Sequence, residues 1–181
     1  MRQNRDEKIK KLLQDSRKLY HIQDLAVLWG IENPNTLYTT VKRYLKRGLL
    51  RRVYKGFYST KPLNEIDAVV LGLSALRAYG YLSTETVLAQ SGIIFQQVHQ
   101  ITLVSDRNRH FEIGGQKFLV RKMKPDYLYN EVGIIASGLD KRATLERAVA
   151  DMLYFNPKYH FDAGATIDWN KVKLIQTKIG Y

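Results

Sequence analysis

The sequence predicts an α+β protein with two domains, the first over residues 1–61 and the second over residues 62–181. Apolar residues recur at helical spacing in the first 47 positions, and β-forming runs broken by glycine pairs or Lys-Gly follow at positions 49–59 and 100–123. Pro62 and Asn64 interrupt the pattern between the two regions. A hydrophobic content of 45% over 181 residues is enough for buried cores.

The charge of the chain is concentrated near its N-terminus. Of the net +12, residues 1–62 contribute +10, with 15 basic and 5 acidic side chains. A surplus of this size indicates a polyanionic partner or an anionic membrane surface. The apolar runs fall well short of the ~20 residues that a membrane span requires, and no signal-peptide core follows the N-terminus, so we expect a cytoplasmic protein without a membrane partner. The absence of cysteine excludes disulfides and thiolate chemistry and fits a reducing compartment.

Two helices are predicted before residue 31. In the segment 6–16, apolar residues recur at Ile9, Leu12 and Leu13, and Asp6 and Glu7 are expected near the positive end of the helix. The next segment has an apolar stripe at Ile22, Leu25, Ala26, Leu28 and Trp29. Gly30 is expected to end this second helix in a left-handed conformation.

A third helix is predicted from about Asn33 to Gly48. Either Asn33, followed by Pro34 in the first turn, or Asn35 is its cap. Four residues at helical spacing face inward, namely Leu37, Val41, Tyr44 and Leu45. Polar and basic residues are left on the outer side, namely Asn35, Thr36, Thr39, Lys42, Arg43, Lys46 and Arg47.

A basic β-hairpin is predicted next, in "LLRRVYKGFYS", with Lys55-Gly56 as its two-residue turn. Three helices closed by a basic hairpin are typical of a winged helix-turn-helix, which binds double-stranded DNA. A helix of ~10–12 Å diameter fits the major groove, and the hairpin lies against the flanking backbone. The alternatives to DNA binding are a solvated helix face beside a cationic turn, or a winged helix that binds another protein.

We separate the candidate DNA-binding residues by reach. The residues expected to contact base edges in the groove are Asn35, Thr36, Thr39, Lys42 and Arg43. Those expected to bind phosphates are Lys46, Arg47, Arg51, Arg52 and Lys55. Tyr38 and Tyr54 could contact the DNA backbone, but packing on the small core is the expectation for both.

The second domain is predicted to mix helices and strands. A mostly buried helix is expected over residues 65–79, and a second one is expected to begin at Ser83 as cap, with Glu85 in its first turn, and to end at Gly92. Strands are expected at 100–105, 109–113 and 117–123, with Gly114-Gly115 as a hairpin turn, and near 133–137. A helix follows in 143–155, and a narrower amphipathic helix capped by Asp168 follows in the tail.

The order of these motifs resembles a known family. "KRGLLRRVYKGFYS" in a winged helix, then "YLSTETVLAQSGII", a strand region and "ATLERAVADMLY" resemble the AbiEi family, the antitoxin and transcriptional-regulator half of type IV toxin–antitoxin (abortive infection) systems. The resemblance spans most of the chain. It implies that the N-terminal domain binds direct or inverted repeats near its own promoter and that the C-terminal domain counters a nucleotidyltransferase toxin.

The resemblance carries over to particular residues. For DNA binding, the matching positions are the residues of the third helix and the hairpin. For the second domain, the matching residues are Tyr81, Leu82, Ser83, Leu145, Glu146, Arg147 and Asp151. Most of these are expected to be structural: Ser83 as a helix cap, Leu145 in the core, and Glu146, Arg147 and Asp151 as surface or ion-paired residues.

Catalysis has little support in the sequence, and we expect no metal, no cofactor and no enzyme. The four histidines, His21, His99, His110 and His160, are scattered without a metal-ligand spacing. Asp106, Glu112 and Lys117 invite comparison with nuclease sites, but the lysine follows the glutamate by five residues, which is off the usual spacing. "IGGQ" lacks the lysine and hydroxyl residue of a phosphate loop.

Three hypotheses follow from this sequence. The favoured one is a DNA-binding autorepressor that acts as an antitoxin. The second is a stand-alone winged-helix regulator whose C-terminal domain senses a ligand or dimerises, and the third is a nucleic-acid-processing enzyme. A homodimer that reads two half-sites and a monomer that reads repeats cooperatively are both compatible with the sequence.

Overall fold

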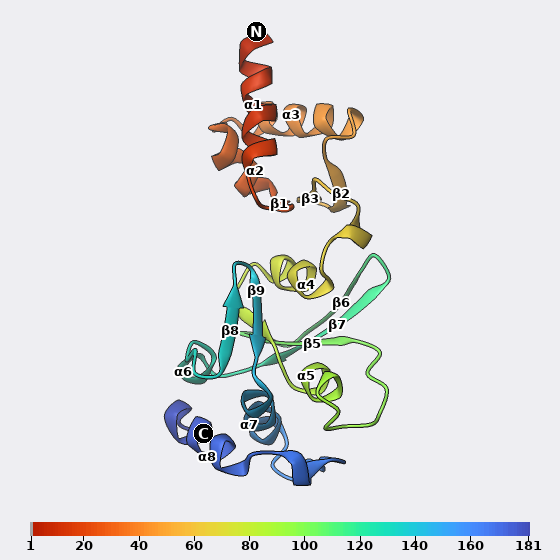
Figure 1. Ribbon diagram of the computed structural model, residues 1–181. Coiled ribbons are helices and arrows are strands. Elements are labelled where there is room, and N and C mark those ends of the chain that lie inside the picture. The colour runs from red at the N-terminus through yellow and green to blue at the C-terminus, as the bar shows by residue number, and fades with distance from the viewer. Residues whose placement is uncertain (1) are drawn as a thin grey trace. The chain divides into compact units, whose positions relative to one another are not determined.

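The computed structural model describes residues 2–181 and has a mixed α+β fold, as the sequence predicts (Figure 1). Its elements gather into two units, one ending at Asp67 and the other spanning Ala68–Tyr181. The first unit contains the helices α1 (Arg2–Gln14), α2 (Ile22–Trp29) and α3 (Pro34–Lys46) and an antiparallel sheet of order β1-β3-β2. The strands of this sheet are β1 (Leu19–His21), β2 (Arg51–Tyr54) and β3 (Phe57–Ser59).

The first helix differs from its predicted form in two ways. It begins at Arg2, so Asp6 and Glu7 fall in its second turn and its first turn has no acidic residue. Of the apolar residues from which the helix was predicted, Leu13 is 74% exposed, whereas Leu12 is 4% exposed. Ile9 packs against the core beside Leu12. Leu13 is turned by ~100° from Leu12, which places it beyond the edge of the buried stripe.

The core of the first unit lies between the three helices and the sheet. Its buried members are Leu12, Tyr20, Leu25, Trp29, Leu37, Val41, Tyr44, Leu50 and Tyr58. The Trp29 and Tyr44 rings meet edge to face at 5.0 Å between centroids, and the indole N–H donates to the carbonyl oxygen of Lys8 at 3.2 Å. Gly30 ends α2 at φ +60°, as predicted, because a residue without Cβ adopts the left-handed conformation without strain. Together these contacts hold α3 against the body of the unit.

The second unit is built on a mixed six-stranded sheet of order β6-β7-β5-β4-β9-β8. Its strands are β4 (Gly80–Leu82), β5 (Ile101–Ser105), β6 (Arg109–Ile113), β7 (Gln116–Lys122), β8 (Ile134–Ser137) and β9 (Asp140–Ala143). The helix α4 (Ala68–Leu76) covers one face, and α5 (Glu85–Gln90) and α7 (Leu145–Phe155) cover the other (Figure 1). The helix α8 (Trp169–Ile179) packs against α7, and the short α6 (Pro125–Leu128) links β7 to β8.

Several predictions for the second unit are confirmed, and that for Ser83 is wrong. Leu145, expected in the core, is only partly buried. The Gly114-Gly115 turn has positive φ at both residues and joins β6 to β7, and Asp168 caps α8 by accepting the main-chain N–H of Lys171. Ser83 is not a helix cap, because the cap position of α5 is Thr84. Residues 80–82 form the strand β4, and this strand carries Ser83 into the interior.

Candidate nucleic-acid interface

The start of α3 is fixed by Asn33, which settles the choice between the two predicted caps. The Oδ1 atom of Asn33 accepts the main-chain N–H groups of Asn35 at 2.9 Å and Thr36 at 3.2 Å. Pro34 occupies the first turn, where its missing N–H costs no hydrogen bond. The inward side of the helix buries Leu37, Val41 and Tyr44 in the core. The opposite side of α3 is therefore held in a fixed orientation relative to the unit.

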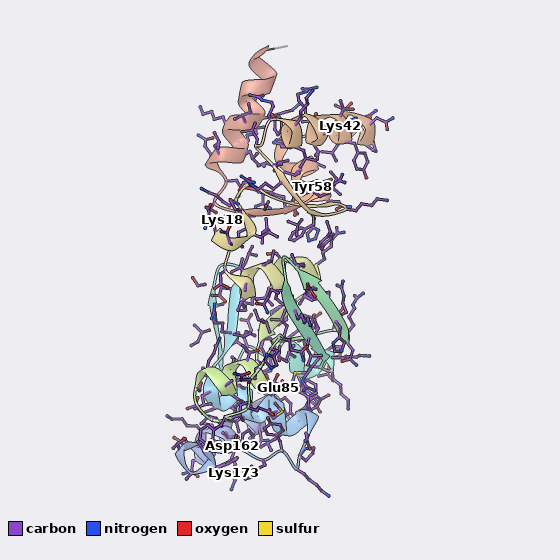
Figure 2. The ribbon with its side chains drawn as sticks, turned by 90° about the vertical axis from the view of Figure 1, so that its right-hand side faces the viewer. Lys18, Lys42, Tyr58, Glu85, Asp162 and Lys173 are labelled. Carbon is purple, nitrogen blue, oxygen red and sulfur yellow. The ribbon has the colours of Figure 1, made fainter. Side chains whose placement is uncertain are left out.

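The outer face of α3 consists of the seven polar and basic residues Asn35, Thr36, Thr39, Lys42, Arg43, Lys46 and Arg47. All are exposed except Arg43, which is half-buried. Lys42 lies on this helix in Figure 2. The structure describes no ion pair between these cations and a carboxylate. Three exposed cations and the half-buried Arg43 thus lie on α3 and its cap residue Arg47 without a countercharge from the described residues.

The hairpin adds three further cations. Lys55 and Gly56 form its turn, with Gly56 at φ +84°, and Arg51, Arg52 and Lys55 are all exposed. Arg52 pairs with Tyr58, whose side chain lies in the core beneath the helices, whereas Arg51 pairs with Ser59. Because neighbouring strand residues point to opposite faces, Arg52 shares the sheet face of the helices and Arg51 does not.

The prediction that Tyr38 packs on the core is wrong, because its side chain is 57% exposed on α3. Tyr54 is 39% exposed but packs its ring on Phe57, with 5.0 Å between centroids. Tyr38 lies one helical turn before Lys42 and flanks the outer face on the side opposite Thr36. It is therefore a candidate contact residue, the alternative that the sequence offered but did not favour. Its angle on the helix, rather than the packing preference of aromatic residues, was the signal that could have identified it.

A second group of polar residues gathers inside the second unit. This Arg147 cluster consists of Tyr81, Ser83, Met123, Arg147, Asp151 and Tyr181. The Nε atom of Arg147 donates to Asp151 Oδ1 at 2.8 Å, and Nη2 donates to the Tyr81 hydroxyl at 2.7 Å. Asp151 also accepts the hydroxyls of Ser83, at 2.7 Å, and Tyr181.

The Arg147 cluster is structural rather than a ligand site. Arg147 and Asp151 are both 0% exposed, so the expectation of a surface position is wrong, although the expected ion pair is present. Nη1 of Arg147 also donates to the carbonyl oxygens of Asn130 and Val132, each at 2.9 Å. Burial, followed by the charge of Asp151, raises the pKa of Tyr81, so this hydroxyl stays protonated. With its donors satisfied by protein, the cluster joins β4, α7 and the segment after α6.

The residues compared with a nuclease site do not converge. Glu112 and Lys117 are cross-strand partners in β6 and β7, but Asp106 follows β5 and binds Arg107 at 2.8 Å. The described side chains include no group of three histidine, aspartate or glutamate residues placed to hold a metal ion. Within the described part of the chain, no helix is both long and apolar enough to cross a membrane.

Comparison with known proteins adds no assignment. No model of a known protein family matches this chain, and no curated protein matches it either. The resemblance of the sequence to the AbiEi family therefore stays a prediction.

Proposed function

We propose that the first unit is a winged helix-turn-helix that binds double-stranded DNA and that the protein is a cytoplasmic transcriptional repressor of its own promoter. The observation that carries the proposal is the outer face of α3, where polar residues in the first turns give way toward the C-terminus to cations that pair with no carboxylate of the described residues. A basic hairpin follows within five residues of the helix end. This order of elements matches a helix that contacts base edges followed by a β-hairpin that binds phosphates.

The two sets of side chains have different roles in this proposal. Asn35, Thr36 and Thr39 are short and polar, so they suit base edges at close range. Long basic side chains neutralise phosphates and displace condensed counterions, which makes binding depend on salt. Arg52, on the face of the sheet shared with the helices, is the hairpin residue best placed to act together with α3. Tyr38 adds a hydroxyl that reaches sugar or phosphate.

A titration of promoter fragments tests this function. If the basic face neutralises ~5–7 phosphates per protomer, log affinity falls against log salt with a slope of roughly −4 to −6. Arg52→Ala should weaken binding to all sequences alike and reduce the slope by about 1. Lys42→Ala should weaken specific binding by ~1–3 kcal/mol if it removes a base contact. Binding that does not respond to salt would contradict the proposal.

The matched control is Lys173→Ala, an exposed lysine on α8 in the second unit (Figure 2). It removes the same charge from the chain and should leave the slope unchanged. If Lys173→Ala and Arg52→Ala reduce affinity equally, net charge rather than the proposed surface drives binding.

We also propose that the second unit makes the protein an antitoxin against a nucleotidyltransferase toxin. Support comes from the motif residues themselves: Tyr81, Ser83, Arg147 and Asp151 come from two distant motifs and meet in one buried cluster. Because these residues are buried together and determine the fold, the resemblance to the AbiEi family rests on fold-determining positions and not on surface residues. Growth rescue on coexpression with a nucleotidyltransferase encoded beside this gene tests the role, and failure to rescue would count against it.

The alternative, a stand-alone regulator that senses a ligand, is favoured by one observation. A hollow of about 330 Å³ in the second unit is lined by polar side chains that include Thr86, His99, Gln100 and Gln116. This volume is at the lower end of the range of small-molecule sites. A metabolite that changes DNA affinity would select this alternative. A homodimer remains part of either proposal, because winged-helix repressors commonly read two half-sites.

A further inference from the structure

Thr39 presents an apolar group on the outer face of α3. Its hydroxyl donates to the main-chain carbonyl oxygen of Asn35, one helical turn earlier, at 2.8 Å. A threonine hydroxyl has a single hydrogen, so an external partner meets an oxygen lone pair and a methyl group. The same hydrogen bond selects one side-chain rotamer and thereby fixes the position of this methyl.

Asn35 has the complementary character. Its main-chain N–H and carbonyl oxygen are both used locally, by Asn33 and Thr39. No hydrogen bond to its exposed side-chain amide is found among the described residues. An amide offers one acceptor and two donors, the pair of functions that matches the N7 and N6 atoms of adenine in the major groove.

The surface between these two residues is hollowed. Asn35, Thr36, Thr39, Thr40 and Arg43 line a shallow depression of about 260 Å³. The Thr40 hydroxyl donates to the carbonyl oxygen of Thr36 at 2.8 Å, so Thr40, like Thr39, has no free hydroxyl hydrogen to offer a ligand. Arg43 brings the only charge among the lining residues. The threonine methyl groups give this depression an apolar part that can receive the methyl group of a base, beside the Asn35 amide and the Arg43 guanidinium, which can donate to base acceptors.

We propose that α3 selects half-sites with an adenine under Asn35 and a thymine whose C5-methyl group contacts the Thr39 methyl. This inference rests on the proposed DNA-binding function and adds which bases are read. Four residues of helix advance by ~6 Å, and stacked bases are ~3.4 Å apart, so the adenine and the thymine lie within about two base-pair steps.

The experiment begins with the full chain and a random-sequence duplex pool, from which retained duplexes are selected. In a selected duplex, each thymine is then replaced by uracil, which removes only the C5-methyl group. We expect one thymine per half-site to lose about fourfold in affinity, the equivalent of about 0.8 kcal/mol for one buried methyl-sized group. Elsewhere in the site uracil should be tolerated.

Two variants of Thr39 separate its methyl from its hydroxyl. Thr39→Val keeps a methyl and removes the hydroxyl, so it should still distinguish thymine from uracil. Thr39→Ser keeps the hydroxyl and removes the methyl, so it should bind both duplexes equally. Asn35→Ala should likewise abolish the preference for adenine over 7-deazaadenine at its position. Thermal unfolding of all three variants checks that the unit stays folded.

The outcomes separate the inference from the function beneath it. Loss of thymine discrimination in Thr39→Ser but not in Thr39→Val supports the inference. Equal discrimination by both variants, or salt-dependent binding without any thymine sensitivity, overturns the inference and leaves DNA binding in place. A pool that yields no retained duplex at low salt overturns both.

Discussion

Replacing Arg147 by methionine should remove much of the stability of the second unit. Methionine fills a similar length of space but cannot donate a hydrogen bond, so Asp151 stays buried with the hydroxyls of Ser83 and Tyr181 as its remaining donors. Breaking a buried ion pair on one side costs about 3–5 kcal/mol. The carbonyl oxygens that lose the guanidinium add to this cost. The sum approaches the ~5–15 kcal/mol that stabilises an ordinary domain.

Urea unfolding of the full chain, monitored by far-UV circular dichroism, measures this loss of unfolding free energy. The matched control is Arg107→Met, which removes the same side chain from an exposed pair with Asp106 and should change the midpoint little. The double variant Arg147→Met/Asp151→Leu should recover part of the loss, because no charge is then left buried without its partner. The reasoning is refuted if Arg147→Met and Arg107→Met shift the midpoint equally, or if the double variant is less stable than Arg147→Met.

Two further predictions concern the same unit. A Cβ added at Gly72 would lie 2.4 Å from the Phe118 ring, so Gly72→Ala should lower stability by ~1–3 kcal/mol in thermal unfolding, whereas Gly164→Ala, with its nearest atom at 3.7 Å, should be tolerated. Burial, the largest influence, would raise the pKa of Glu85, but the hydrogen bonds from Arg121, the Glu85 main chain and Thr84, together with the charge of Arg121, outweigh it and hold that pKa below the usual 4.5. A carboxyl whose pKa is lower in the folded state stabilises the fold at pH values above its unfolded-state pKa, and this stabilisation is lost as pH falls. The loss of unfolding free energy in Glu85→Gln should therefore be constant above about pH 5 and shrink below about pH 4.5. A loss that does not change with pH would contradict the lowered pKa of Glu85.

Elements with a long periodic pattern could be predicted from the sequence. The inward positions of α3, its termination before Gly48 and both glycine-containing hairpin turns follow from local spacing and from the freedom of glycine at positive φ. The same reasoning gave the residues of the outer face of α3. Tyr38 was assigned to the core because an aromatic residue was judged by its average behaviour instead of its angle on the helix.

Features that depend on distant partners could not be predicted. The strands β1, β4 and β9 have three or four residues each, too few to establish a period of two, and they are strands because a neighbour pairs with them. Ser83 has the residue type and setting of a helix cap. Its burial follows from Asp151, which lies 68 positions away along the chain, and nothing in the local sequence indicates that contact.

That separation has a kinetic consequence. The hydrogen bond from Ser83 to Asp151 and the pairing of β4 with β9 close a large loop that contains β5, β6 and β7. Closing such a loop costs chain entropy before its contacts return any enthalpy, and proteins rich in non-local contacts fold slowly. We therefore expect the pairing of β4 with β9 in the middle of the sheet to form late. A partly formed sheet that lacks this pairing is then the species most exposed to misfolding.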